Sequence, residues 1–380
     1  MVIYYFNQGG SLLDYELINT LSENRKVVAI MHGNGLLMNE NIELMQSPAF
    51  CNKTISSRLI SWLKYILFAL PVLFRIKSGD KAIITTNPPI LQLLMPVLRL
   101  RGVDVTFWVL DLYPNALWCG TSVKERSIVP IFWKLLNRLT FVWANELVSL
   151  SNSMCNALKR YLPFFKHKNV HQISTWVNHL EFKPVPRGQN EVLKELNLYD
   201  RFVVLYSGNV GATHDLSFLP KLATHLIENE RVVFLVVGRG QGCDILKKEC
   251  EHLANVAFLP PQPIEKLGST MSAGYVGLVS QGDNTGGISM PSKTYYYMAC
   301  GCALMGVVPV DSGVRDVVER FECGRCFLKN EIKAMADFIR ELAINEGLLR
   351  KYQANSRVAA ANYYSRIRCV NLWVKILNIE

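Results

Sequence analysis

Short runs of β-branched and aliphatic residues alternate with helical stretches along the whole chain, and this alternation restricts the possible folds more than any other feature. The runs are nearly continuous in apolar residues, which is typical of parallel strands that helices cover on both faces. We expect strands at residues 2–6, 27–31, 82–86, 103–110 and 146–149, and then at 203–207, 232–237, 256–259, 275–279, 303–307 and 325–328. The pattern predicts an α/β protein with two doubly wound, Rossmann-like domains.

The chain is long enough for both domains. It has 380 residues, half of them apolar, which suffices for two hydrophobic cores. Both periodicities stop at residues 183–190, where Lys-Pro-Val-Pro-Arg-Gly-Gln-Asn is typical of a linker. We expect a first domain at 1–185, a second at 190–362, and a C-terminal helix at 363–380 that packs back on the first domain. Open parallel sheets bind ligands beyond the carboxyl ends of their strands, so the two sheets should face each other across a cleft.

The formal net charge of +10 is concentrated in the first half of the chain. Residues 1–190 carry 20 basic and 11 acidic side chains, whereas residues 191–380 carry 21 and 20. Such an excess favours an anionic partner, either a membrane surface or nucleic acid. The basic residues lie among apolar residues and do not form a polar stripe, so the pattern disfavours nucleic-acid binding.

Two strongly apolar segments accompany this charge. Residues 59–74, from Leu59 to Phe74, and residues 128–143, from Ile128 to Trp143, consist mainly of Leu, Ile, Trp and Phe. The first is shorter than the ~20 residues that cross a bilayer, and it contains Lys64 and Pro71. We expect both segments to lie on the anionic, cytoplasmic face of a cell membrane, which makes the protein peripheral. The alternative is that they are buried packing helices of the domain core.

The ten cysteines are scattered through apolar stretches, and the sequence shows no secretory signal. Reduced thiols in the cytosol are therefore expected. Cys323 and Cys326 are spaced as a metal-binding pair, but no second pair stands nearby to complete a tetrahedral site. The sequence predicts no metal centre.

Three loops of the second half follow expected strands and have the form of phosphate-binding loops. In the first, Gly208 lets the backbone approach a ligand. In the second, Arg239 stands among glycines at the edge of the sheet, where a guanidinium can bind a diphosphate in bidentate fashion. In the third, Pro291, Ser292 and Lys293 offer N–H groups and a cation at the start of a helix. The alternatives are ordinary turns and a solvated loop arginine.

These loops resemble, in the same order, the donor domain of GT-B glycosyltransferases of family 4. The resemblance rests on Ser207-Gly208-Asn209-Val210-Gly211, on Val237-Gly238-Arg239-Gly240, and on Pro291-Ser292-Lys293 with Tyr297-Met298-Ala299-Cys300-Gly301. In the first half, Thr86-Asn87-Pro88-Pro89 and Val109-Leu110-Asp111-Leu112-Tyr113-Pro114 are similar to signatures of the branch that builds bacterial O-antigen, colanic-acid and capsule polysaccharides. The matching landmarks run from about residue 82 to 310.

The resemblance implies a role for individual residues. Asp111, Arg239 and Lys293 would be catalytic: the two cations neutralise the diphosphate leaving group, which needs no metal, and Asp111 orients the acceptor hydroxyl or the sugar. Asp111 has an alternative role, capping the turn before Pro114. The residues implied in donor binding are Gly9, Gly10, Gly208, Asn209, Gly238, Pro291, Ser292 and Tyr296.

The sequence also departs from the family pattern. Many members place two glutamates eight residues apart around the last helix, whereas Ile288 and Tyr296 stand at those positions here. Tyr296 or a neighbour would then make the ribose contact. Gly9 and Gly10 occupy the place of the family's first glycine loop, although a tight turn into a helix explains them equally well.

The leading hypothesis is therefore a glycosyltransferase that transfers a hexosyl or N-acetylhexosaminyl group. It would move a sugar from a nucleotide diphosphate sugar, with UDP favoured, to a polyprenyl-diphosphate-linked glycan in bacterial surface polysaccharide synthesis, with retention of configuration. One alternative is a nucleotide-sugar epimerase of the same architecture, which needs no lipid-facing helices. The other is a non-catalytic scaffold of a polysaccharide-assembly complex.

Overall fold

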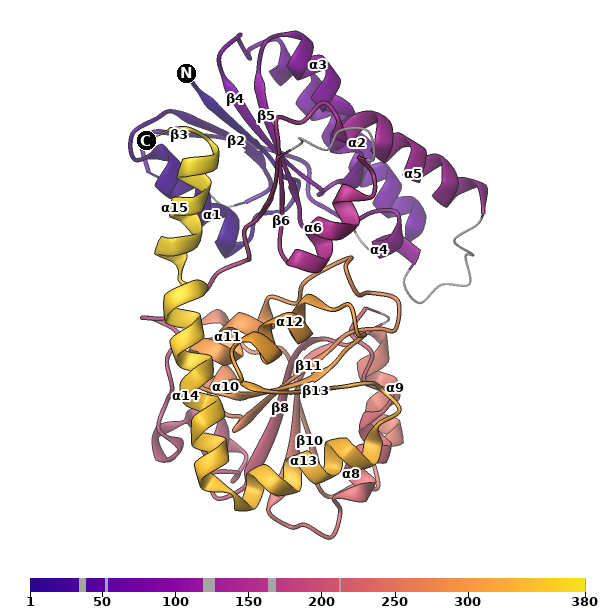
Figure 1. Ribbon diagram of the computed structural model, residues 1–380, viewed down its shortest axis with the longest axis vertical. Coiled ribbons are helices and arrows are strands. Elements are labelled where there is room, and N and C mark those ends of the chain that lie inside the picture. Colours follow the sequence, from indigo (N-terminus) through magenta and orange to yellow (C-terminus); the bar gives the residue numbers. More distant parts are fainter. Residues whose placement is uncertain (34–38, 52–53, 119–126, 163–168, 212, 380) are drawn as a thin grey trace.

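Two parallel sheets, each covered by helices, form the two halves of the computed structural model (Figure 1). The structure describes residues 1–33, 39–51, 54–118, 127–162, 169–211 and 213–379. Within these residues the first sheet has the strand order β3-β2-β1-β4-β5-β6-β7 and the second the order β10-β9-β8-β11-β12-β13. Both orders reverse direction beside the first strand of their sheet, as in doubly wound nucleotide-binding folds. The predicted fold class is confirmed.

The first sheet consists of β1 (Ile3–Phe6), β2 (Val27–Met31), β3 (Ile42–Gln46), β4 (Lys81–Thr85), β5 (Asp104–Val109), β6 (Glu146–Ser149) and β7 (Asn169–Gln172). The second consists of β8 (Phe202–Asn209), β9 (Val232–Arg239), β10 (Val256–Leu259), β11 (Val276–Ser280), β12 (Ala303–Val307) and β13 (Gly324–Phe327). The prediction missed β3 and β7. Both are edge strands that are only partly buried, so their sequences, IELMQ and NVHQ, lack the continuous apolar run of a central strand.

The helices of the first half are α1 (Leu12–Ser22), α2 (Ile55–Leu73), α3 (Leu94–Leu100), α4 (Asn115–Trp118), α5 (Ile128–Phe141) and α6 (Asn152–Lys159), with the 3₁₀ helix η1 (Pro89–Leu93). Those of the second half are α7 (Glu191–Glu195), α8 (Leu219–His225), α9 (Gln241–Glu249), α10 (Leu267–Met271), α11 (Lys293–Ala299), α12 (Gly313–Arg320), α13 (Ile332–Ile344), α14 (Glu346–Tyr363) and α15 (Arg366–Ile376), with η2 (Arg187–Gln189) and η3 (Ile264–Lys266).

Alternate residues of each central strand enter different cores, because successive side chains of a strand point to opposite faces. In β1, Tyr4 and Phe6 pack with α2, α3 and α5, whereas Ile3 and Tyr5 pack with α1 and α15. The second sheet is covered in the same way, by α8, α9 and α13 on one face and by α11, α12 and α14 on the other. The core that contains Ile3 continues from the first sheet into the second.

The end of the chain returns to the first half. Helix α14 runs along the second half, and α15 crosses to lie beside α1, as the yellow ribbon in Figure 1 shows. Trp373 of α15 meets Trp108 of β5 edge to face, with 4.9 Å between ring centroids. The Arg357 guanidinium of α14 donates hydrogen bonds to the carbonyls of His179, Phe182 and Ala299, so it ties the segment between the two sheets to the second half.

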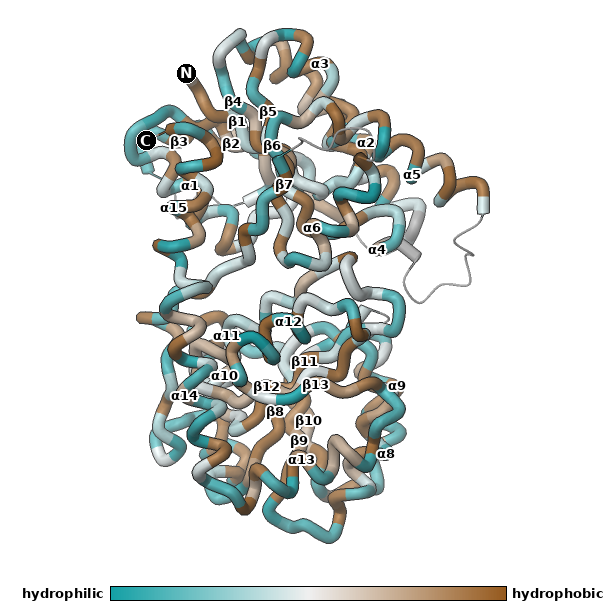
Figure 2. The backbone as a smooth tube through the Cα atoms, in the orientation of Figure 1, coloured by the Kyte–Doolittle hydropathy of each residue, from teal (hydrophilic) through white to brown (hydrophobic). Residues whose placement is uncertain are grey.

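Helices α2 and α5 each bury one face and expose another that is also apolar. In α2, Trp62 and Tyr65 are buried, whereas Leu63 and Leu67 are 56% and 59% exposed. In α5 the exposed residues include Ile128, Ile131, Phe132, Leu135 and Leu139. In Figure 2, much of the α5 backbone, which extends from the side of the first half, has the brown colour of hydrophobic residues. The alternative interpretation, in which both segments are buried packing helices of the domain core, is therefore wrong for the exposed faces of α2 and α5.

A window of α2 from Ser56 to Leu73 is long and apolar enough to cross a membrane by length and composition, and 33% of it is buried in the protein. In the described part of the chain, no other helix passes that test. Trp62 and Tyr65 are nevertheless buried on the side of α2 that faces the first sheet. This burial indicates that α2 is packed on the domain.

Candidate active site

The ends of β8 and β9 bring two of the three predicted donor loops together. The two strands pair in register, with Gly208 opposite Gly238 and Asn209 opposite Arg239. A Cβ atom at Gly238 would lie 2.0 Å from the Gly208 carbonyl oxygen, so this position requires glycine for the close approach of the two strands. The packing of the two strands therefore accounts for a glycine at position 238, and its predicted donor contact stays a prediction.

Lys293, from the third predicted loop, lies at the same end of β8. Its Nζ lies 3.8 Å from the centroid of the Tyr206 ring, and a Cβ atom at Gly208 would lie only 2.8 Å from it. Gly208 has a φ of +139°, which also favours glycine. Because Gly208 has no side chain, the Lys293 ammonium can occupy the space beside it.

The Lys293 ammonium is buried against the Tyr206 ring without a hydrogen-bond acceptor. Its Nζ is shielded from solvent and donates no hydrogen bond to any residue that the structure describes. Burial lowers the pKa of Lys293 to about 7. A buried ammonium without an acceptor is costly, and an anion that entered the site would remove that cost. The arrangement is therefore suited to binding a negatively charged group.

Arg239 stands at the end of β9 with its side chain exposed. Its guanidinium makes no ion pair with any residue in the described part of the chain, although its carbonyl accepts a hydrogen bond from the Val210 N–H at 2.8 Å. Asn209 lies opposite it, and the Asn209 carbonyl accepts a hydrogen bond from the Tyr206 hydroxyl at 2.6 Å. This edge of the sheet therefore presents one buried cation and one exposed cation.

Asp111 approaches from the first half. It follows β5, and the Thr86 hydroxyl accepts hydrogen bonds from the N–H groups of Leu110 and Asp111 at 3.1 and 3.2 Å. The two motifs of the first half, one after β4 and one after β5, are thus joined at their strand ends. Burial raises the pKa of Asp111 to about 6, and its carboxylate has no ion-pair partner among the described residues.

The two halves touch directly at this point. Asp111 forms an antiparallel bridge with Ser289, and the Leu112 N–H donates a hydrogen bond to the Ile288 carbonyl at 2.8 Å. A pocket of about 300 Å³ lies beside the bridge. It is lined by Asp111, Tyr113, Ala116, Thr213, His214, Thr285, Ile288, Ser289, Met290, Pro291 and Ser292. Three residues predicted for the site, Asp111, Pro291 and Ser292, therefore share one pocket.

His214 also lines this pocket, although the sequence analysis assigned it no role. Its Nδ1 lies 3.1 Å from the Ser280 carbonyl oxygen. Burial and the nearby Lys293 charge lower the pKa of His214 to about 4, so the imidazole is neutral at physiological pH. Its position directly after a glycine loop was visible in the sequence, but its proximity to Asp111 depends on how the two halves meet.

Gly9 and Gly10 follow β1 in a turn held by local contacts. The Asn7 side chain accepts hydrogen bonds from the Gly9 N–H at 3.1 Å and from the Asn87 amide at 3.0 Å. A Cβ atom at Gly10 would lie 2.4 Å from the His32 carbonyl oxygen. Neither glycine lines the pocket around Asp111. The turn and its packing explain both of them.

Tyr296, a predicted donor contact, is partly buried on α11, and its contact with the donor stays a prediction. Its ring meets the Phe182 ring edge to face, with 4.8 Å between centroids, and it is not among the residues that line the pocket around Asp111. Lys293 and Tyr297 lie on the face of α11 that meets β8, where the Tyr297 hydroxyl accepts a hydrogen bond from the Ser207 N–H at 2.6 Å.

No group of three or more His, Cys, Asp or Glu side chains that would hold a metal ion occurs within the described residues. Asp215, the carboxylate next to His214, is engaged in an ion pair with Lys329, and this pair holds the pKa of Asp215 below its usual value against the opposing effect of burial.

No protein-family model matches the chain. The probable glycosyltransferase WbjE of Pseudomonas aeruginosa is 26% identical to it over 297 residues, which is 77% of this chain and 73% of that protein. Among solved structures, HepE of Anabaena in complex with UDP is similar over 100% of both chains, with a TM-score of 0.75 and 12% identity. WaaG, a glycosyltransferase involved in lipopolysaccharide biosynthesis, is similar over 98% of this chain and 99% of that chain, with a TM-score of 0.68 and 12% identity.

The structural neighbours show the fold, and the relative in sequence shows the kind of activity. The two facing parallel sheets are those of the GT-B architecture. Taken with the curated relative, they make this chain an enzyme of the glycosyltransferase class, of the GT-B type.

Proposed function

We propose that the protein transfers a sugar from a nucleotide diphosphate sugar to a polyprenyl-diphosphate-linked glycan during the synthesis of a bacterial surface polysaccharide such as O-antigen. The observation that carries the donor half of this proposal is the buried Lys293 ammonium without a hydrogen-bond acceptor, at the strand ends where Arg239 also stands. Two cations at one edge of a sheet match the charge of a diphosphate. Family 4 is the proposed family.

The donor is proposed to be a UDP-sugar. Structures of Anabaena HepE with UDP and with UDP-glucose support this choice, because they share the fold over nearly the whole chain. Lys293 and Arg239 would stabilise the charge that develops on the leaving diphosphate, and Ser292 would add a contact to a phosphate oxygen. The reaction needs no metal in this proposal, and the configuration of the transferred sugar is retained.

Asp111 is proposed to act on the acceptor. Its carboxylate lines the pocket next to Ser292, and a pKa near 6 lets it accept a hydrogen bond or a proton from the attacking hydroxyl at neutral pH. The neutral imidazole of His214 lies in the same pocket and offers a ring nitrogen to the sugar hydroxyls.

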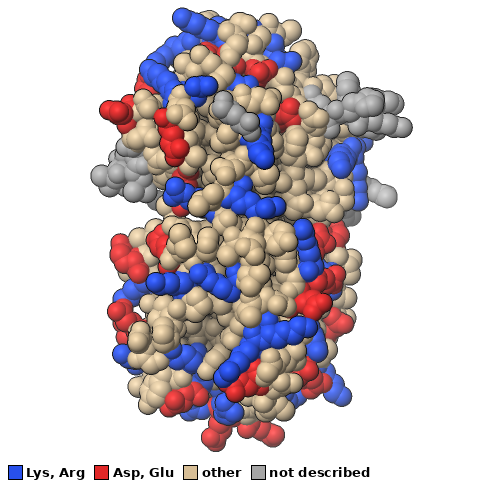
Figure 3. Space-filling model, turned by 60° about the vertical axis from the view of Figure 1, so that its left-hand side comes forward, with Lys and Arg blue, Asp and Glu red and all other residues tan. Residues whose placement is uncertain are grey.

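The acceptor is proposed to be held at the inner face of the cell membrane, where the exposed apolar faces of α2 and α5 contact lipid. Large exposed apolar surfaces on a folded domain mark interaction sites, and these two belong to the half that carries nearly all of the net positive charge. On the face of the molecule in Figure 3, acidic and basic side chains are mixed over the second half.

The decisive experiment incubates the purified protein with a panel of nucleotide sugars and polyprenyl-diphosphate-linked acceptors and detects the product by mass. Transfer of one sugar to a lipid-linked acceptor is expected, and NMR of the product tests whether the configuration is retained. Interconversion of the free nucleotide sugar without transfer would instead identify an epimerase. Failure to bind any nucleotide diphosphate sugar in calorimetry would favour the scaffold.

Membrane contact has its own test. Leu63→Ser with Leu67→Ser should abolish co-sedimentation with vesicles that contain phosphatidylglycerol and leave the melting temperature nearly unchanged, because both side chains are more than half exposed. The matched control is Trp62→Ala on the same helix, a buried position that should destabilise the fold by about 3–5 kcal/mol. Undiminished binding of the double variant to vesicles would refute the proposed contact.

A further inference from the structure

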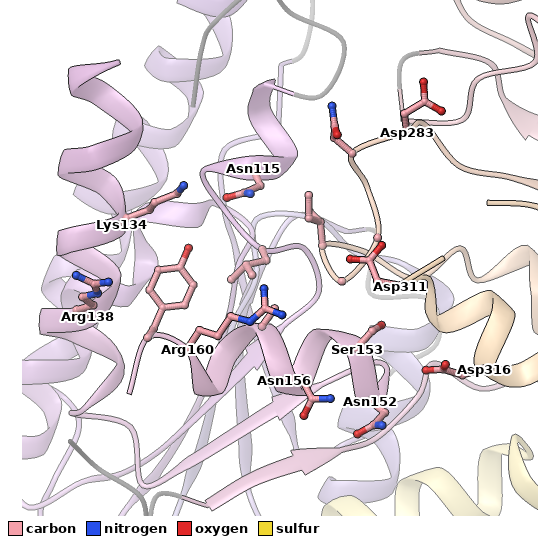
Figure 4. Close-up of a pocket in the computed structure, with 17 residues that line it drawn as sticks. Asn115, Lys134, Arg138, Asn152, Ser153, Asn156, Arg160, Asp283, Asp311 and Asp316 are labelled. Carbon is pink, nitrogen blue, oxygen red and sulfur yellow. The ribbon is translucent and has the colours of Figure 1, made fainter. Parts of the chain in front are cut away.

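A second and larger pocket lies between the two halves, beside the one that contains Asp111. Its volume is about 700 Å³, and Ile288 lines both pockets. Figure 4 shows its two walls: helices α5 and α6 of the first half on one side, and the loops that carry Asp283 and Asp311 on the other. The donor loops at Gly208 and Arg239 do not line it.

The wall from the first half is cationic. Lys134 and Arg138 stand one turn apart on α5, and Arg160 follows the end of α6. Arg138 and Arg160 make no ion pair and no side-chain hydrogen bond with any residue in the described ranges of the chain. Three basic groups on two neighbouring helices, two of them uncompensated, are suited to a phosphate or a diphosphate.

The opposite wall is acidic. Asp283, Asp311 and Asp316 line it from the second half. The Asp311 carboxylate lies against Gly286, where a Cβ atom would be 1.8 Å from Asp311 Oδ1, so glycine is needed there to leave the carboxylate in place. Carboxylates accept hydrogen bonds from sugar hydroxyls, and they repel phosphate. The pocket therefore orients a ligand that has phosphate at one end and hydroxyl groups at the other.

The cationic wall adjoins the apolar face of α5. Ile131, Leu135 and Leu139 are exposed on that helix, and Lys134 and Arg138 each stand one residue before an exposed leucine. One residue corresponds to a turn of about 100° around a helix, so the two cations flank the apolar face. A phosphate bound to them would place an attached lipid chain along this apolar face. This geometry selects a lipid-linked diphosphate over a free one.

We propose that Lys134, Arg138 and Arg160 bind the diphosphate of the lipid-linked acceptor, and that the acidic wall binds the hydroxyls of its glycan. The inference rests on the proposed function and deepens it by assigning the acceptor-diphosphate site to named residues. The glycan then extends from the membrane-facing helix α5 past Ile288 towards Asp111, and the lipid chain leaves the pocket along the apolar face of α5.

Calorimetry of the full-length protein with geranyl diphosphate, a short isoprenoid diphosphate, tests the site without requiring transfer. The wild-type protein should bind this probe, and Arg138→Gln with Arg160→Gln should weaken binding at least tenfold, because two charge-assisted contacts are lost. Affinity for UDP-glucose and the melting temperature should not change, since both arginines are exposed and lie outside the donor loops. Geraniol, which has the same chain without phosphate, should not bind detectably.

The matched control is Lys64→Gln with Lys159→Gln. It removes the same net charge from the same half of the protein, at exposed positions that do not line the pocket. This control should bind geranyl diphosphate as the wild-type protein does. In the transfer assay, the arginine variant should raise KM for the lipid-linked acceptor at least tenfold with little change in KM for the donor.

Three outcomes would overturn the assignment: no binding of geranyl diphosphate to the wild-type protein, equal weakening in both double variants, or a loss of UDP-glucose affinity in the arginine variant. If the arginine variant lost binding to phosphatidylglycerol vesicles but kept its affinity for geranyl diphosphate, the cations would serve bilayer headgroups instead. A further outcome separates this site from the proposed function. If the arginine variant selectively lost geranyl diphosphate binding, but the wild-type protein transferred sugar to no acceptor, the site would be supported and the proposed function refuted.

Discussion

The buried ammonium of Lys293 leads to a quantitative prediction about proton uptake. Its pKa of about 7 in the free protein follows from burial without a hydrogen-bond acceptor or a counter-charge. A bound diphosphate supplies the missing counter-charge, which should return the pKa of Lys293 towards its ordinary value. Binding of the donor at pH 8 should therefore be accompanied by the uptake of about 0.9 proton, falling to about 0.5 at pH 7 and about 0.1 at pH 6.

The same linkage fixes how affinity depends on pH. Above pH 7 the free protein must acquire a proton to bind, so the dissociation constant for the donor should rise by up to about tenfold for each pH unit. Lys293→Met should remove both the proton uptake and this dependence, and it should weaken binding at pH 6, where the wild-type ammonium is charged before the donor arrives.

Calorimetry with UDP-glucose in PIPES, HEPES and Tris buffers measures the uptake, because the observed enthalpy varies with buffer ionisation enthalpy in proportion to the protons exchanged. Lys221→Met, an exposed lysine of the same half, is the matched control and should behave as the wild-type protein does. His214→Gln separates any contribution of the neighbouring imidazole. Proton uptake below about 0.2 at pH 8 in the wild-type protein, or uptake that survives in Lys293→Met, would refute the reasoning.

Three further predictions concern the donor edge and the contact between the halves. Arg239→Ala should lower kcat by about 10² or more with the fold intact, because its side chain is exposed and a cation beside the leaving group is lost; near-normal turnover in steady-state assays would remove it from the site. Asp111→Asn should lower kcat and abolish the decline in rate expected below about pH 6, which a pH–rate profile measures; an unchanged acidic limb would assign that decline to another group. Gly238→Ala should lower the melting temperature markedly, since its Cβ would lie 2.0 Å from the Gly208 carbonyl oxygen, whereas Gly188→Ala, with open space around the glycine, should not; equal melting temperatures would contradict the strand contact.

Local sequence patterns were enough to predict those parts of the site that consist of a single strand and the loop after it. Apolar runs predicted every described strand except β3 and β7, the edge strands of the first sheet, and glycines at the ends of β8 and β9 marked the donor loops. The same patterns do not separate a glycine that contacts a ligand from one that admits a neighbouring strand. Gly238 and Gly10 look like ligand glycines in the sequence, and the structure explains both by packing.

The sequence by itself determined the fold class, the concentration of positive charge in the first half and the two strongly apolar segments there, because these follow from periodicity and composition. Only the tertiary structure decided that Lys293 is buried without a hydrogen-bond acceptor, and that α2 and α5 expose apolar faces. It also decided that Tyr296 faces Phe182, and that Lys134, Arg138 and Arg160 oppose three aspartates. These features depend on how helices are rotated about their axes and on how two sheets meet. Such long-range contacts leave no periodic signal in the chain.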